Sequence, residues 1–254
     1  MKKNNQVVLK HNPVIRGYFE NKENGNITIL NEFDFDLLNV MYYRTQQNLF
    51  TYDTVEYLNH KKKKFFVHDI KKELNLNSNR YIDMIKESLN RIYSVEINLK
   101  DYTDPISGKK YEWKKTRIIN SFAKFKNSDN IFEIEFNEDF IVSIMRHPKP
   151  KQKIKERTGN FTPIDIKTTR SIKSKYGKRL YEYLKSLKGK SMKNYVVMDI
   201  ESLNRLYGTN HKQLNRVTEI TKRIYEKVNE KFPYTYEIYK ADKKICFRFD
   251  DDSI

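Results

Sequence analysis

VMDIESLNRLYGTNHKQLNRVTEITKRIYEKVNE, residues 197–230, contains the order of elements that decides the fold. Its short apolar start predicts a strand that ends at Asp199, and aspartate is a residue type that caps helix N-termini. A short helix, a polar turn and a longer helix are expected next. Two alternating stretches, 234–240 and 245–250, then predict a β-hairpin. Strand, helix, turn, longer helix and hairpin together predict a winged helix, a helix-turn-helix variant whose hairpin flanks the longer helix.

The first half of the chain contains a fainter copy of the same pattern. There VHDI leads through a polar turn to LNRIYSVEINL, as VMDI leads to TKRIYEKVNE in the second half. The aspartate precedes the RIY triplet by 22 residues in the first copy, from Asp69 to Arg91, and by 24 in the second, from Asp199 to Arg223. In each copy the aspartate is expected to cap the shorter helix. The repeat predicts two winged helices in tandem.

Further elements complete each expected unit. The first hairpin is expected at 94–102 and 111–125, and amphipathic segments at 30–47 and 170–189 predict a leading helix for each unit. The fold class is therefore α+β, with two tandem winged-helix domains.

The length and composition support two globular domains. The chain has 254 residues, of which 38% are hydrophobic and 13% aromatic, which is enough for two cores. Residues 146–163 contain three prolines, one glycine and little apolar content, which predicts a linker. It serves either as a solvated tether or as a basic strap on phosphates. The expected division is an N-terminal domain at 1–145, a basic linker at 146–163 and a C-terminal domain at 164–254.

Charge indicates the class of partner. The net charge is +17, with +3 in residues 1–145 and +14 in residues 146–254. Such an excess favours a polyanion, most often nucleic acid, and places most of the binding in the second half. The single cysteine, Cys246, and the lack of an apolar leader or membrane-length apolar run predict a cytoplasmic protein with no membrane partner.

The longer helix of the second unit, expected at 211–231, is the candidate recognition helix. Its apolar residues share one side, and its polar side is rich in the side chains that pair with purine edges in the major groove. The alternative is an ordinary solvated helix face. The predicted DNA-reading residues are His211, Lys212, Asn215, Arg216, Glu219, Lys222 and Arg223.

Other basic residues are expected to contact DNA phosphates or to bind more weakly. Phosphate contacts are predicted for the basic side of the 170–189 helix and for the second hairpin, namely Lys175, Lys178, Arg179, Lys240, Lys243 and Lys244. The first unit offers Asn79, Arg80 and Lys86 beside the acidic Asp83 and Glu87. It is therefore expected to be the poorer DNA reader.

Enzymatic sites find little support in the sequence. There is no GxxxxGK[ST] phosphate loop, and the five histidines form no pair with metal-ligand spacing. The best catalytic candidate, Asp104 with Glu112 and Lys114, resembles a metal-dependent nuclease centre only loosely, and such triplets arise easily in a Lys/Glu-rich chain. We expect no catalytic residue, no metal and no cofactor.

The segment SKYGKRLYEYLKS, residues 174–186, resembles the signature of the initiator Rep proteins of iteron-containing, theta-replicating plasmids. There S-K-Y, two variable residues, R-L-Y-E and a further L-K recur before the second winged helix. LNEFDFDLLNVM, VMDIESLNRLYG and VNEKF resemble the family less closely. One departure concerns the second recognition helix: many members have an aromatic residue followed by consecutive basic ones, where this chain has Arg216, Val217, Thr218 and Glu219.

The resemblance implies a function and partners. Monomers would bind repeated double-stranded DNA sites at a plasmid origin, and dimers would bind an inverted repeat to repress the protein's own gene. The second domain would make the main major-groove contacts, and the first a lesser DNA contact or the dimer interface. The host replication initiator and the replicative helicase would be recruited. The alternatives are a winged-helix transcriptional regulator and, more distantly, an origin nickase or nuclease.

Overall fold

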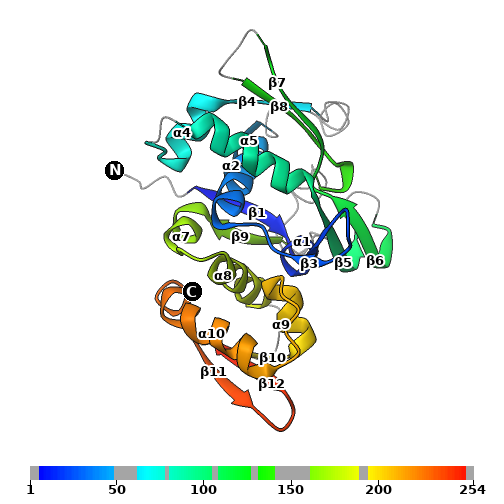
Figure 1. The fold of residues 1–254 in the computed structure, drawn as a ribbon, viewed down its shortest axis with the longest axis vertical. Helices are drawn as coiled ribbons and strands as arrows, with labels where there is room; N and C mark the ends of the chain where they lie inside the picture. Colours follow the sequence, from blue (N-terminus) through cyan, green and yellow to red (C-terminus); the bar gives the residue numbers. More distant parts are fainter. Residues whose placement is uncertain are drawn as a thin grey trace, which may run out of the picture.

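The computed structural model describes residues 6–48, 62–77, 80–104, 108–126, 131–140, 161–188 and 194–249. Within these ranges the chain folds into two units of mixed helix and strand, joined in the middle by helices α7 (Ile166–Ser171) and α8 (Lys175–Leu187) (Figure 1). Each unit has the order strand, short helix, longer helix and hairpin. The predicted α+β fold with two winged helices is therefore confirmed.

The second unit follows the sequence prediction closely. Strand β10 (Tyr195–Asp199) leads into α9 (Ile200–Tyr207), and the Asp199 carboxylate caps α9 by accepting the Ser202 amide at 2.8 Å. Helix α10 (Leu214–Asn229) and the hairpin of β11 (Tyr234–Tyr239) and β12 (Lys244–Phe249) complete it. The sheet order is β10-β12-β11, all antiparallel. Helix α10 begins three residues later than expected, so His211 and Lys212 lie in the preceding turn.

The first unit has the same order but a larger sheet region. Helix α2 (Glu32–Asn48), strand β4 (Lys62–Phe66) and helices α4 (Val67–Leu74) and α5 (Tyr81–Tyr93) precede β5 (Val95–Thr103). Helix α4 begins at Val67, before Asp69, and its N-cap residue is Phe66. The prediction that Asp69 caps this helix is therefore wrong, because Asp69 already lies in the first helical turn.

The expected second strand of the first hairpin, 111–125, divides into two strands. Strand β6 (Lys110–Arg117) pairs with β5, whereas β7 (Ile119–Lys124) pairs with β8 (Ile131–Phe136). Strands β2 (Tyr18–Asn21) and β3 (Ile27–Thr28) extend the first sheet to the order β3-β2-β5-β6, and a second sheet has the order β4-β8-β7.

The two halves of the chain are connected by strand pairing. Strand β1 (Val7–His11), which precedes α1 (Asn12–Arg16), pairs antiparallel with β9 (Phe161–Asp165). Residues 161–163, expected to end the linker, therefore belong to a strand, and linker residues 146–160 lie outside the described ranges. The pairing ties the start of the expected C-terminal domain to the first strand of the N-terminal one.

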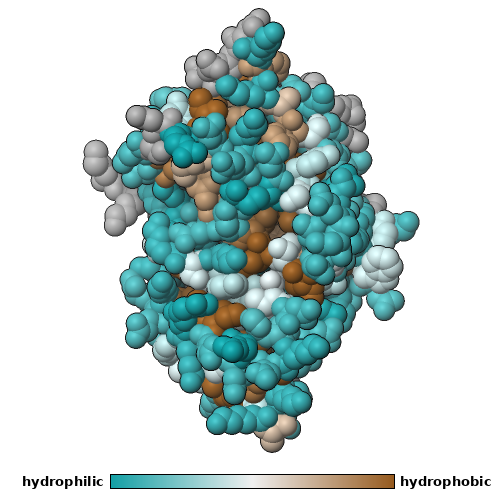
Figure 2. All heavy atoms as spheres, in the orientation of Figure 1, coloured by the Kyte–Doolittle hydropathy of each residue, from teal (hydrophilic) through white to brown (hydrophobic). Residues whose placement is uncertain are grey.

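Helix α8 lies at the centre of the molecule. It contacts α1 and α2 of the first half and α9 and α10 of the second, and the buried apolar side chains of both units form one continuous cluster. On the face seen in Figure 2 the surface is mostly hydrophilic, with hydrophobic residues in small separate areas. Among large hydrophobic side chains in the described ranges, Trp113 on β6 is the most exposed, at 71%.

Candidate DNA interface

Helix α10 separates its residues into a buried side and a solvent side. Leu214, Val217, Ile220, Ile224 and Val228 are buried in the core. The other side of the helix, with the turn before it, carries the predicted reading residues. Of these, Lys212, Asn215, Arg216, Glu219, Lys222 and Arg223 are exposed and His211 is half-buried. The structure therefore brings all seven together on one accessible surface, which we call the α10 face.

The turn before α10 is held by the side chain of Asn204. Its amide nitrogen donates to the His211 carbonyl at 2.8 Å, and its oxygen accepts from the His211 amide at 3.0 Å and from the Thr209 hydroxyl at 2.8 Å. Gly208 caps α9 in the left-handed conformation, with φ of 59°. The chain turns after α9 through this left-handed residue, a conformation that favours glycine. Together with the Asn204 hydrogen bonds, it fixes the direction in which α10 leaves the turn.

Arg216 and Glu219 form an ion pair on the α10 face at 3.6 Å. Both side chains are about two-thirds exposed, so the ion pair contributes little to the stability of the fold. The Arg216 guanidinium can therefore leave Glu219 and bind a base edge at little energetic cost. Gln213 is also exposed at the N-cap of α10. The predicted set of reading residues omits Gln213. Glutamine pairs bidentately with adenine, so its side-chain chemistry could have identified it from the sequence.

The hairpin of the second unit presents three lysines. Lys240, Lys243 and Lys244 are all exposed at the turn between β11 and β12, and Lys243 adopts a left-handed conformation with φ of 53°. A cluster of three ammonium groups beside a helix-turn-helix is suited to phosphate contacts.

The prediction that Lys178 and Arg179 contact phosphates is wrong. The two residues are 0% and 3% exposed, respectively. The polar arc of α8 is covered by the first half of the chain, which a count of angles around a single helix does not reveal. Of the three predicted residues on α8, Lys175 alone reaches solvent, half-buried with its ammonium 5.1 Å from the ring centroid of Tyr176.

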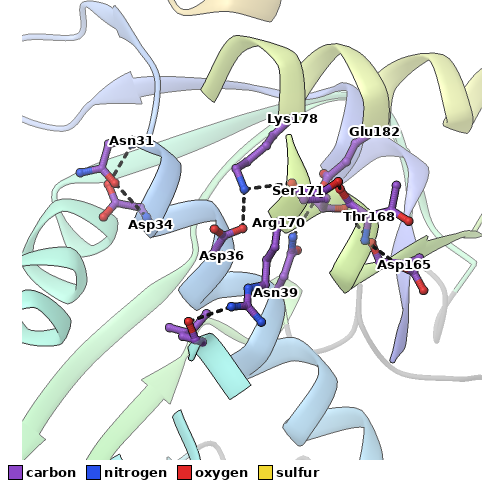
Figure 3. Close-up of polar contacts among 12 residues, drawn as sticks. Asn31, Asp34, Asp36, Asn39, Asp165, Thr168, Arg170, Ser171, Lys178 and Glu182 are labelled. Carbon is purple, nitrogen blue, oxygen red and sulfur yellow. Dashed lines mark hydrogen bonds and ion pairs between the residues drawn. The ribbon is translucent and has the colours of Figure 1, made fainter. Parts of the chain in front are cut away.

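The buried cations of α8 have partners within the protein instead, and Figure 3 shows the pair of Lys178 with Asp36 of the first half. The Lys178 ammonium donates to the Asp36 carboxylate at 2.6 Å and to the Thr169 carbonyl at 2.9 Å. Burial lowers the pKa of Lys178, and the negative charge of Asp36 opposes this. Arg179 donates to the Gly17 carbonyl at 2.5 Å. The signature segment thus joins the two halves of the protein.

The first unit presents a mixed charge pattern. On and beside α5, Arg80, Lys86, Asp83 and Glu87 are exposed, and Asn79 lies outside the described residues. Arg91, whose place in the repeat corresponds to Arg223, donates three hydrogen bonds to the Asp34 carboxylate near the start of α2, at 2.9, 3.0 and 3.1 Å.

The loosely nuclease-like triplet has no metal-binding geometry. Glu112 is exposed on β6, and the Lys114 ammonium pairs with Asp139. Within the described ranges, no three His, Cys, Asp or Glu residues gather as metal ligands would. In the same ranges, no helix combines the length and apolar character needed to cross a membrane.

Comparisons with known proteins bear on the fold. A search of curated proteins gave no significant match. Among solved structures, the Pi initiator protein in complex with iteron DNA is similar over 98% of this chain and 100% of its own, with a TM-score of 0.58 and 12% identity. Domains 2–3 of RctB align over 92% of each chain, at 13% identity and a TM-score of 0.46.

A family model supplies the assignment. The model described as the WH1 domain of the initiator replication proteins matches residues 22–185, well over half of the sequence. This range includes α2, the first winged helix, and all but the last two residues of α8. The chain therefore belongs to the initiator replication protein family.

Proposed function

We propose that this protein initiates plasmid replication by binding repeated double-stranded DNA sites, or iterons, at the origin. The observation that carries the proposal is the α10 face, where seven predicted reading residues lie together beside three hairpin lysines in a family of replication initiators. The fold shared with the Pi initiator, whose structure contains iteron DNA, supports this partner.

The residues of the second unit divide into two roles. Arg216, Asn215 and Gln213 have the chemistry to read bases from the first turns of α10, where recognition helices contact base edges. Lys240, Lys243 and Lys244 neutralise phosphates and hold the helix in register. We assign the main DNA contact to residues 164–254 and a lesser contact, with the dimer interface, to residues 1–145.

The remaining parts of the function follow from the family resemblance. Monomers bind the direct repeats and open the origin, and homodimers in equilibrium with them bind an inverted repeat and repress the gene. The host initiator and replicative helicase are recruited to the opened origin in the cytoplasm. The protein acts by binding, without a catalytic residue or cofactor of its own.

Footprinting of the protein on DNA that flanks its gene tests this proposal. We expect a periodic footprint over direct repeats, because each monomer covers one repeat. Protection that is uniform along the DNA, or absent, would contradict it. A plasmid with these repeats should be maintained only when the gene is supplied, whereas a transcriptional regulator would be dispensable for maintenance.

A nicking assay tests the enzymatic alternative. Supercoiled DNA that contains the repeats should stay uncut in the presence of the protein and Mg²⁺. Reproducible nicking that Glu112→Ala abolishes would overturn the assignment of a purely binding function.

A further inference from the structure

Two buried ion pairs connect α8 to the first half of the chain. Lys178 of α8 meets Asp36 of α2 at 2.6 Å, and Glu182, one turn later on α8, accepts from the ammonium of Lys10 of β1 at 2.7 and 2.8 Å. Figure 3 shows the Lys178 and Asp36 side chains pointing toward each other between α8 and α2. We call these two pairs the α8 lock.

The burial of the α8 lock makes its geometry exacting. The two side chains of the first pair are 0% and 11% exposed, and those of the second are 7% and 3% exposed. Two apolar surfaces can shift against each other at little cost. A buried charge that moves away from its partner loses the attraction that offsets its removal from water, which is strongly unfavourable. The lock therefore selects one position of α8 against α2 and β1.

Two further contacts extend this connection to the helix-turn-helix motifs themselves. The Arg170 guanidinium of α7 donates to the carbonyls of Glu73 and, at 2.7 Å, Leu74, which end α4 just before the turn that leads to α5. In the second unit, Gly208 lies against the main chain of Thr28 in β3, so closely that a methyl group would overlap the Thr28 carbonyl. Each turn is thus docked on an element from the other half of the chain.

We infer that these contacts set a fixed spacing between α5 and α10, and that Lys178, Asp36 and Arg170 are positioning residues for the spacing of the DNA site. Helix α8 also packs directly on α10, so a position fixed at α2 is transmitted to the reading helix. The inference rests on the proposed function, because it concerns how two DNA-binding units act on one site.

The physical consequence is a strict dependence on DNA geometry. Two units that read one face of a duplex must meet their grooves at a set separation, and about 10 base pairs complete one helical turn. Inserting five base pairs rotates one subsite to the opposite face, so a rigid protein loses one of its two contacts. The loss of a linked contact lowers affinity by about 100-fold or more. If the two domains were loosely joined, one of them could still reach the displaced subsite, and the DNA affinity would fall much less.

The experiment uses the full-length protein and a duplex that the wild type selects from a random 30-base-pair library. Insertions of one to ten base pairs are placed at the centre of the selected site, and affinity is measured for each. For the wild type we expect a fall of about 100-fold at five inserted base pairs. For Lys178→Met and Arg170→Gln we expect weaker binding to the parent site and a fall of less than about tenfold at five base pairs.

Two controls separate positioning from general damage. Lys62→Met removes an ammonium that is largely exposed and pairs with Glu133 inside the first unit, so it should keep the wild-type spacing profile. The double variant Asp36→Leu/Lys178→Met replaces the first pair of the lock by apolar groups and should remain folded. It is measured in place of Lys178→Met if that variant does not fold.

The outcomes distinguish this inference from the proposed function. If the wild type selects no duplex, the proposed function fails. If the wild type selects a duplex and tolerates five inserted base pairs, or if folded lock variants and Arg170→Gln keep its full spacing dependence, the positioning role is overturned while the proposed function stands.

Discussion

The two helix-turn-helix regions share a backbone plan but differ in the chemistry of their exposed faces. Both short helices end at a left-handed residue, Asn75 after α4 with φ of 50° and Gly208 after α9 with φ of 59°. Yet α10 exposes a face with four basic residues counting the preceding turn, whereas on α5 the exposed Lys86 stands beside Asp83 and Glu87. The arginine of the repeated RIY triplet is exposed in α10 but pairs with Asp34 in α5.

This difference separates what the fold requires from what binding requires. The core positions of the repeat are kept in both units because each must bury one side of its longer helix. The outward positions are free to differ, and only the second unit uses them for a strongly basic surface. A winged helix alone therefore does not indicate a DNA reader.

The largest expected effect concerns the two left-handed turn residues. Gly208→Ala should destabilise the protein by roughly 2 to 4 kcal/mol, because alanine is strained at this φ and its methyl group overlaps the Thr28 carbonyl. Asn75→Gly in the first unit should change stability by less than about 1 kcal/mol. Urea denaturation measures both, and equal effects would show that Gly208 is not specially constrained.

A smaller difference is expected between the two reading helices. Arg216→Ala should weaken binding to the cognate site by about 1 to 3 kcal/mol and relax specificity at one base pair. Lys86→Ala on α5 should weaken binding to all DNA sequences equally. It should also reduce the slope of log affinity against log salt concentration by about one. Fluorescence anisotropy at several salt concentrations separates the two patterns. Unchanged cognate binding by Arg216→Ala would mean that the reading face is placed wrongly.

Charge removal on α5 should make the first unit resemble the second. Asp83→Asn combined with Glu87→Gln removes two exposed negative charges and should strengthen DNA binding a few-fold at low salt, with the gain disappearing at about 1 M salt because screening is then nearly complete. The same anisotropy assay measures this. If affinity is unchanged at low salt, α5 does not approach the DNA.

The smallest effect concerns the strands that lead into the two units. Lys63 of β4 occupies the place that Val196 has in β10, and partial burial lowers the pKa of Lys63 to about 8. Between about pH 8 and the usual lysine pKa of 10.5, the unfolded chain binds more protons at this site than the folded one, so wild-type stability should rise with pH relative to Lys63→Val. Thermal unfolding at a series of pH values measures this. If the stability of the two proteins changes with pH in the same way, the prediction is wrong.

Much of the fold was predictable because its signals are local. The apolar periodicity of α10, the turn before it and the alternation of β11 and β12 each lie within one short stretch of sequence, and the structure confirms them. Asp199 caps its helix as predicted, whereas Asp69 does not, because α9 begins one residue after its aspartate and α4 begins two residues before its own. Helix starts depend on packing that a cap residue alone does not decide.

The misassigned cations show what local signals miss. Lys178 lies on the polar arc of α8, but its partner, Asp36, is 142 residues away in the sequence. The sequence of α8 alone does not indicate that the first half of the chain covers this arc. The division of the first hairpin into β6 and β7 was missed for a similar reason, since β7 continues the alternating pattern but pairs with β8, outside the hairpin.

Trp113 gives the protein an unusual optical property. It is the single tryptophan of the chain, and it is 71% exposed on β6. Intrinsic tryptophan emission will therefore resemble that of an indole in water even in the native state and will change little on unfolding. The same fluorophore reports selectively on any molecule that covers the first hairpin, with no other tryptophan to subtract.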